Sequence, residues 1–115
     1  RMSMGINVIV DDVAGYKVVR LEGKLDATSS PMLEDQLSEL LGEKHHHLFI
    51  DFTRLEYLSS AGMRLLLSTT KKLKSEGGKL SLFAINDEVM EIIDMAGFEK
   101  ILFIYSNEEE AMKAM

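Results

Sequence analysis

The chain has 115 residues, a length that fits one domain and suffices to bury a hydrophobic core without a metal or a disulfide. It contains no cysteine, which excludes disulfides, thiolate catalysis and zinc–sulfur sites. The net charge of −6 and the pI near 5.0 argue against nucleic acid or an anionic membrane as the partner, because that binding depends on clustered Lys and Arg. A protein partner is favoured instead.

The ends of the chain and its hydropathy lead to further expectations. No apolar run approaches the ~20 residues of a membrane span, and no charged and then apolar leader precedes a cleavage site. We therefore expect a soluble protein in the reducing cytoplasm. Residues 1–4 are expected to be a flexible end, and Arg1 ahead of Met2 is interpreted as a remnant of expression. We expect residues 1–115 to form one domain.

Two strands are predicted at the start of the chain. Ile6, Val8 and Val10 alternate with other residues as in a half-buried strand. A turn at residues 12–15 then leads to a second strand over 16–23. With so short a connection, the two strands form a hairpin.

A helix is predicted next, with Ser30 as its N-cap and Pro31 at its first position. Leucines at the spacing i, i+4, i+7 and i+8 form one apolar stripe, and Gly42 is expected to end the helix. The run 48–52 is apolar except for Asp51, which predicts a central strand covered on both faces. The leucines of the stripe are Leu33, Leu37, Leu40 and Leu41.

The rest of the chain alternates between helical and extended patterns. A helical repeat starts at Met63 and ends at Gly77-Gly78, and Asn86 and Asn107 each offer an N-cap to a later helix. Apolar runs predict two further strands, at 80–85 and 101–105. The order ββαβαβαβα predicts an α/β fold in which an opening β-hairpin and three βα crossovers build a mixed five-stranded sheet with helices packed on it.

Two adjacent serines, Ser59 and Ser60, stand between the central strand and the leucine-rich helix. A hydroxyl at such a place lies beside unpaired backbone N–H groups and the positive end of a helix dipole, where a phosphate is well accommodated. Capping of the helix by either serine is the more common role at such a junction. The two roles are compatible, so the pair is a candidate phosphorylation site.

The stretch from Tyr57 to Met63 resembles the serine loop of anti-sigma factor antagonists of the STAS family, which commonly reads aromatic, apolar, Asp, Ser, Ser or Ala, Gly, Leu or Met. A second, less specific likeness is Gly23-Lys24-Leu25-Asp26, and the order of elements is that of the STAS fold. The resemblance implies a STAS-like domain with Ser60, two residues before Gly62, as phosphoacceptor. The chain departs from the pattern at Ser59, where many members have Asp.

The resemblance also implies a regulator of bacterial transcription that is not an enzyme. Its unphosphorylated form would bind an anti-sigma factor that is also a serine kinase and thereby release a sigma factor. Phosphorylation would end the complex, a phosphatase would reset it, and the chain alone would be a monomer. No cofactor, metal or direct contact with nucleic acid is implied. The partner-binding residues implied are Asp26, Thr28, Ser59, Ser60, Ala61, Gly62, Met63 and Arg64.

Several of these residues have a structural interpretation as well. Gly62 can let a partner approach the backbone, or it can allow the helix start to pack closely on the sheet. Asp26 can help recognition, or it can be a turn residue. Leu65 lies off the apolar stripe and is expected to be exposed; with Arg64 it can contact a partner, or it can be an ordinary exposed leucine. Three consecutive histidines, 45–47, do not form a chelating set unaided, because neighbouring side chains point apart.

Three other functions compete with the switch. A receiver domain is suggested by Asp51 with Asp11 and Asp12, but the hairpin leaves no room for the helix that a receiver needs between its first two strands. A serine hydrolase would need Gly-x-Ser-x-Gly and a histidine after Ser60, and neither exists. A STAS scaffold or nucleotide-sensing module that is never phosphorylated remains the alternative.

Overall fold

The computed structural model describes residues 2–3, 5–43 and 46–115, so the interpretation of Arg1 lies outside the described part. The strands form one sheet in the order β1-β2-β3-β4-β5-β6. The pair β2/β3 is antiparallel, and each later pair is parallel. The five predicted strands are confirmed, and a short edge strand, β1, adds to them. The strands are β1 Met2–Ser3, β2 Ile6–Val13, β3 Tyr16–Leu25, β4 His47–Leu58, β5 Lys79–Phe83 and β6 Phe103–Tyr105.

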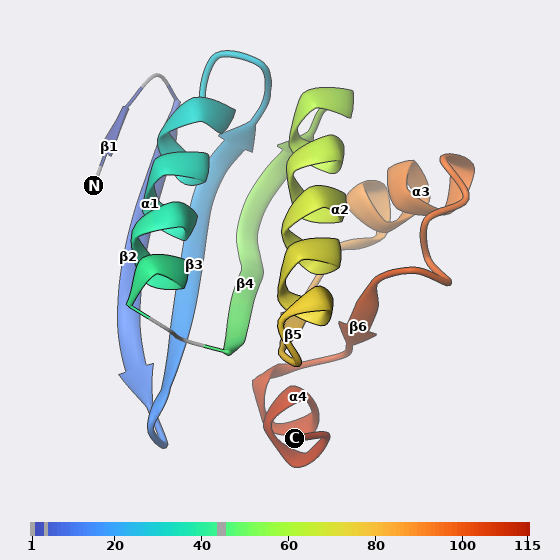
Figure 1. Cartoon of the computed structure of the whole chain (residues 1–115). Helices are drawn as coiled ribbons and strands as arrows, with labels where there is room; N and C mark the ends of the chain where they lie inside the picture. Colours follow the sequence, from blue (N-terminus) through green and yellow to red (C-terminus); the bar gives the residue numbers. More distant parts are fainter. Residues whose placement is uncertain (1, 4, 44–45) are drawn as a thin grey trace.

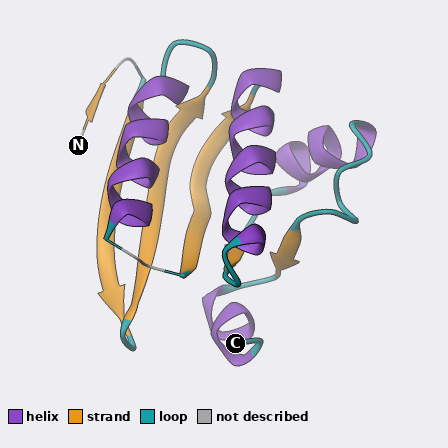
Figure 2. Ribbon diagram, in the orientation of Figure 1, coloured by secondary structure: helices purple, strands orange, loops and turns teal. Residues whose placement is uncertain are grey.

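The helices cover the two faces of the sheet unequally. Figure 1 shows α1 and α2 side by side across one face, and Figure 2 shows the strands behind them. Buried residues of α3 belong to the same apolar cluster as those of α1 and α2. The short α4 packs on the other face, where Ala111 joins Val18, Phe49 and Phe83 in a second, smaller cluster. The helices are α1 Ser30–Gly42, α2 Ser60–Ser75, α3 Asp87–Met95 and α4 Glu108–Lys113.

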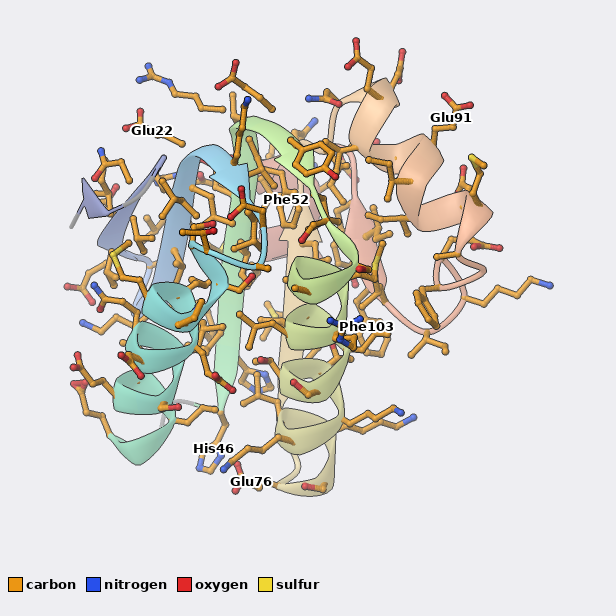
Figure 3. All side chains as sticks on the ribbon, turned by 90° about the horizontal axis from the view of Figure 1, so that it is seen from above. Glu22, His46, Phe52, Glu76, Glu91 and Phe103 are labelled. Carbon is orange, nitrogen blue, oxygen red and sulfur yellow. The ribbon has the colours of Figure 1, made fainter. Side chains whose placement is uncertain are left out.

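Strand β4 is central, as its apolar run predicted. Leu48, Ile50 and Phe52 face the large cluster under α1 and α2, whereas Phe49 faces the cluster under α4. All four side chains are fully buried. Figure 3 shows Phe52 inside the molecule, between the helices and the strands.

Three helix ends follow from local sequence. The Asn86 side chain accepts a hydrogen bond from the Val89 N–H at 2.8 Å, and the Asn107 side chain accepts one from the Glu110 N–H at 2.9 Å. Both predicted N-caps are confirmed. Just beyond α2, Gly77 has a φ of +79°, a conformation that glycine adopts at low cost and that ends the helix where the sequence predicted.

Two local predictions are wrong. Ser30 is the first residue of α1 and not its N-cap; that position belongs to Ser29, whose hydroxyl donates to the Lys24 carbonyl and does not cap the helix. Leu65 is only 8% exposed and belongs to the large core cluster. It is covered because α1 lies alongside α2, which widens the buried face of that helix beyond its own apolar stripe.

No helix in the described part of the chain is both long enough and apolar enough to cross a membrane.

Candidate functional site

The predicted site residues come from the loop after β3 and from the start of α2, at one end of the sheet. Strands β3 and β4 are parallel and end together, with Leu25 paired to Leu58. Because of this register, the Ser59 N–H donates to the Leu25 carbonyl at 2.9 Å. The loop after β3 and the start of α2 therefore lie next to each other, at the top of Figure 1. This brings Asp26 into the neighbourhood of Ser59 and Ser60.

The two serines at the start of α2 have different environments. The Ser59 side chain accepts a hydrogen bond from the Gly62 N–H at 3.3 Å, and its carbonyl accepts one from the Met63 N–H at 2.9 Å. Ser59 is thus the N-cap of the helix. Ser60 is exposed, and no described residue forms a hydrogen bond with its hydroxyl. Capping falls to one serine, and the other is left accessible.

Two backbone donors beside Ser60 are unused. The first N–H groups of a helix have no acceptor within the helix, and here those of Gly62 and Met63 are satisfied by Ser59. The N–H groups of Ser60 and Ala61 have no acceptor among the described residues. They lie at the positive end of a 16-residue helix whose first turn carries no acidic residue. An anion on the Ser60 side chain would be stabilised there.

Asp26 organises the neighbouring loop. Its carboxylate accepts hydrogen bonds from the N–H groups of Ser29 and Thr28, both at 3.0 Å. The bond from the Ser29 N–H holds the pKa of Asp26 below its usual range, and the bond from Thr28 adds to the effect. The turn interpretation of Asp26 therefore accounts for the geometry of its carboxylate. Thr28 is exposed.

Gly62 and Met63 face inward. A Cβ added at Gly62 would lie 2.8 Å from the Leu58 Cδ1 and 2.9 Å from the Leu25 Cγ. The close packing of the helix start on the sheet therefore accounts for this glycine. Met63 is 3% exposed and belongs to the core. Of the predicted contact residues of α2, Ser60 and Arg64 are exposed, and Ala61 is half-buried.

A groove between α1 and α2 begins beside the serine loop, and it is not among the features predicted from the sequence. Its volume is about 380 Å³ and it is open to solvent. No local pattern predicts it, because it arises from the spacing of two helices that are apart in sequence. Its lining consists of Ala27, Ser30, Pro31, Glu34, Ala61, Arg64, Leu65 and Ser68.

Two of the three acidic residues that suggested a receiver domain, Asp11 and Asp51, bind a single arginine, whereas Asp12 pairs with Lys17 at 2.6 Å. Arg20 forms ion pairs with Asp11 at 2.7 Å, Asp51 at 2.9 Å and Glu108 at 2.8 Å. Burial alone would raise the pKa of Asp51, but hydrogen bonds from Thr53 and Arg20 outweigh it and hold that pKa below its usual value. The antiparallel β2/β3 hairpin excludes the receiver fold.

The two described histidines of the run, His46 and His47, belong to no group of potential metal ligands. His46 is exposed, His47 opens β4, and His45 lies outside the described residues. Over residues 2–3, 5–43 and 46–115, no three potential metal-ligating side chains come together.

Comparison with known proteins identifies the family. The STAS domain family matches residues 6–111. An anti-sigma F factor antagonist of Paenibacillus polymyxa is 29% identical over 110 residues, covering 95% of this chain and 94% of that protein. The crystal structure of an anti-sigma factor antagonist from Mycobacterium paratuberculosis has a TM-score of 0.86 at 28% identity, covering 95% of this chain and 92% of that one.

The anti-sigma factor antagonist SpoIIAA of Bacillus shares the fold at lower identity. Its unphosphorylated form has a TM-score of 0.79 at 22% identity, with 94% of this chain and 95% of that chain covered. Its phosphorylated form has a TM-score of 0.71 at 21% identity, with 94% and 98% covered. The fold, the match over residues 6–111 and these relatives agree with the predicted class of regulator, which is not an enzyme. The chain belongs to the STAS domain family, among the anti-sigma factor antagonists.

Proposed function

We propose that the chain is a phosphorylation-controlled switch. In its unphosphorylated form it binds an anti-sigma factor that is also a serine kinase, and a sigma factor is released. Phosphorylation of Ser60 ends the complex, and a phosphatase restores the hydroxyl. The relatives named as anti-sigma factor antagonists support the partner, and the family serine loop, with Ser60 two residues before Gly62, supports the site.

One observation carries the proposal: Ser59 caps the helix, whereas Ser60 is exposed. Ser59 supplies the N-cap, so that modification of Ser60 leaves the cap in place. The Ser60 hydroxyl is exposed and, among the described residues, unbonded. A kinase therefore finds an accessible nucleophile whose modification need not unfold the helix.

The effect of the phosphate follows from its charge. A phosphoserine adds about −1.5 to −2 charges and three acceptor oxygens. The fold tolerates this charge at a helix N-terminus, in keeping with SpoIIAA, which has been solved in both forms. A partner surface that fits a neutral hydroxyl does not tolerate the phosphate, because charge repulsion and the cost of desolvating the phosphate oppose binding. A penalty of ~3 kcal/mol lowers affinity roughly 150-fold.

The proposal extends to the setting of the chain. We place it in the cytoplasm, as a monomer that forms heterocomplexes with its kinase. The net charge of −6 is consistent with a protein partner and not with direct binding to nucleic acid.

Phosphorylation by the kinase that co-purifies from native cells tests the proposal. With Mg-ATP, wild type should gain one phosphate, located on Ser60 by peptide mass spectrometry. Ser59→Ala serves as the matched control and should be modified at Ser60 as well, whereas Ser60→Ala should gain none. Phosphate on Ser59 alone would show that the loop alignment is wrong by one residue. If the bound kinase leaves Ser60 unmodified, the STAS scaffold or nucleotide-sensing alternative is favoured.

A further inference from the structure

Arg64 lies one helical turn beyond Ser60 on α2, and both side chains are exposed. No acidic group in the described part of the chain lies within ion-pair distance of its guanidinium. Arg64 is the only charged residue between positions 60 and 70. An exposed arginine without a partner is therefore the one cation on the first turns of this helix.

The helix geometry directs Arg64 toward Ser60. Residues four apart lie on the same face, with their Cβ atoms about 5–6 Å apart. Each Cα–Cβ bond in a helix tilts toward the N-terminus, so a side chain as long as that of Arg64 can reach back to the turn that begins with Ser60. The intervening Ala61 and Gly62 are small, and the groove that Arg64 lines leaves open space beside them.

Two acidic groups on neighbouring segments also face this region. Glu34 of α1 lines the same groove as Arg64, but it forms no ion pair with it. Asp26, in the loop before α1, already accepts hydrogen bonds from the N–H groups of Thr28 and Ser29. Neither carboxylate forms an ion pair with the Arg64 guanidinium, which is therefore available for an anion on Ser60.

We propose that Arg64 binds the phosphate of modified Ser60 within the same chain, together with the free N–H groups of Ser60 and Ala61. This rests on the proposed function only in taking Ser60 as the modified residue. Arginine suits the role because its planar donors match phosphate oxygens. The pairing makes phosphorylation change two features of the surface at once: it adds an anion and engages the arginine beside it.

The test installs phosphoserine at position 60 during translation, so that no kinase is needed. A nearby cation favours the dianionic phosphate and lowers its second pKa, which lies near 6 without such help. We expect Arg64→Gln to raise that pKa by at least ~0.3 unit, as for an i, i+4 ion pair, when it is followed by 31P NMR during a pH titration.

Lys72→Gln is the matched control. It removes the same charge from an exposed position of the same helix, about 18 Å along the helix from Ser60 and beyond the Debye length of ~8 Å. Its shift should stay below ~0.1 unit, and thermal unfolding should show both variants folded. Equal shifts in the two variants, or none for Arg64→Gln, would overturn the proposal. Because the phosphate is supplied directly, this result is independent of whether a kinase for Ser60 exists.

Discussion

The chain contains two Ser-Ser pairs at helix starts, and the pairs differ in the burial and hydrogen bonding of their hydroxyls. Ahead of α1, Ser29 and Ser30 are 1% and 8% exposed. The Ser29 hydroxyl donates to the Lys24 carbonyl at 2.7 Å and accepts from the Asp26 N–H at 3.0 Å. At α2, Ser59 caps the helix and Ser60 is left exposed.

The difference shows that a serine pair before a helix does not itself define a modification site. At α1 the Ser30 N–H is bonded to the Asp26 carbonyl at 2.8 Å, and the pair is enclosed. At α2 the N–H groups of Ser60 and Ala61 are free among the described residues, and the hydroxyl is accessible. Exposure together with unused donors separates a candidate switch from a structural junction. The predictions below test this separation.

The largest loss of stability is expected for Ser29→Ala. The change removes two hydrogen bonds from a buried position and leaves the Lys24 carbonyl and the Asp26 N–H without that partner. We expect the free energy of unfolding to fall by about 2 kcal/mol in urea denaturation. Ser30→Ala is the control. Its buried hydroxyl has no partner among the described residues, so alanine should be neutral or stabilise by about 0.5 kcal/mol.

Gly62→Ala should cost about 1.5 kcal/mol. The added methyl group would lie 3.0 Å or less from Leu58 and Leu25, and the resulting strain exceeds the gain in helix propensity. Gly42→Ala is the matched control at the end of α1, because a Cβ there meets nothing within 4 Å. It should be neutral or slightly stabilising in the same denaturation assay. Equal effects of the two substitutions would refute the packing interpretation of Gly62.

Ser59→Ala should cost about 1 kcal/mol, the usual contribution of an N-cap side chain. Ser60→Ala should change the free energy of unfolding by less than about 0.5 kcal/mol, because its exposed hydroxyl has no partner among the described residues. Thermal and urea unfolding of both variants measure this directly. A larger loss of stability for Ser60→Ala than for Ser59→Ala would show that Ser60, and not Ser59, caps the helix.

The smallest effect is expected from the charge of Asp26. Hydrogen bonds from Ser29 and Thr28 lower its folded pKa, so the stability it contributes is present above its unfolded pKa of about 3.9. That contribution is lost as the pH falls through the folded value. The difference in melting temperature between wild type and Asp26→Asn should therefore be constant above pH 5 and narrow toward pH 2. A difference in melting temperature that widens as the pH falls would contradict a lowered folded pKa of Asp26.

Much of the fold could be predicted from the sequence because its signals are local. Asn86 and Asn107 each cap a helix by accepting a hydrogen bond from the N–H group three residues later. The short connection between residues 10 and 16 permits only a hairpin. The apolar run of β4 reports burial on both faces directly. In each case the determining contact lies within a few residues.

What could not be predicted depends on distant contacts. Whether a serine caps a helix depends on the competing acceptor, and the Lys24 carbonyl draws Ser29 away from α1. Leu65 is buried because α1 lies beside α2. The Arg20 network joins residues from three strands and α4, and the groove beside Arg64 depends on the distance between two helices. Ser59 and Ser60 could be singled out together, but only the structure separates their environments.

The central claim is that partner binding requires position 60 to carry no anionic group and that the fold does not depend on the Ser60 hydroxyl. The most direct measurement is titration of the co-purified kinase with wild type, Ser60→Ala and Ser60→Asp at one salt concentration, with unfolding of each variant measured in parallel. We expect Ser60→Ala to bind like wild type. Ser60→Asp should bind at least ~10-fold more weakly, or ~1.4 kcal/mol, and keep its stability. Tighter binding by Ser60→Asp would contradict the switch.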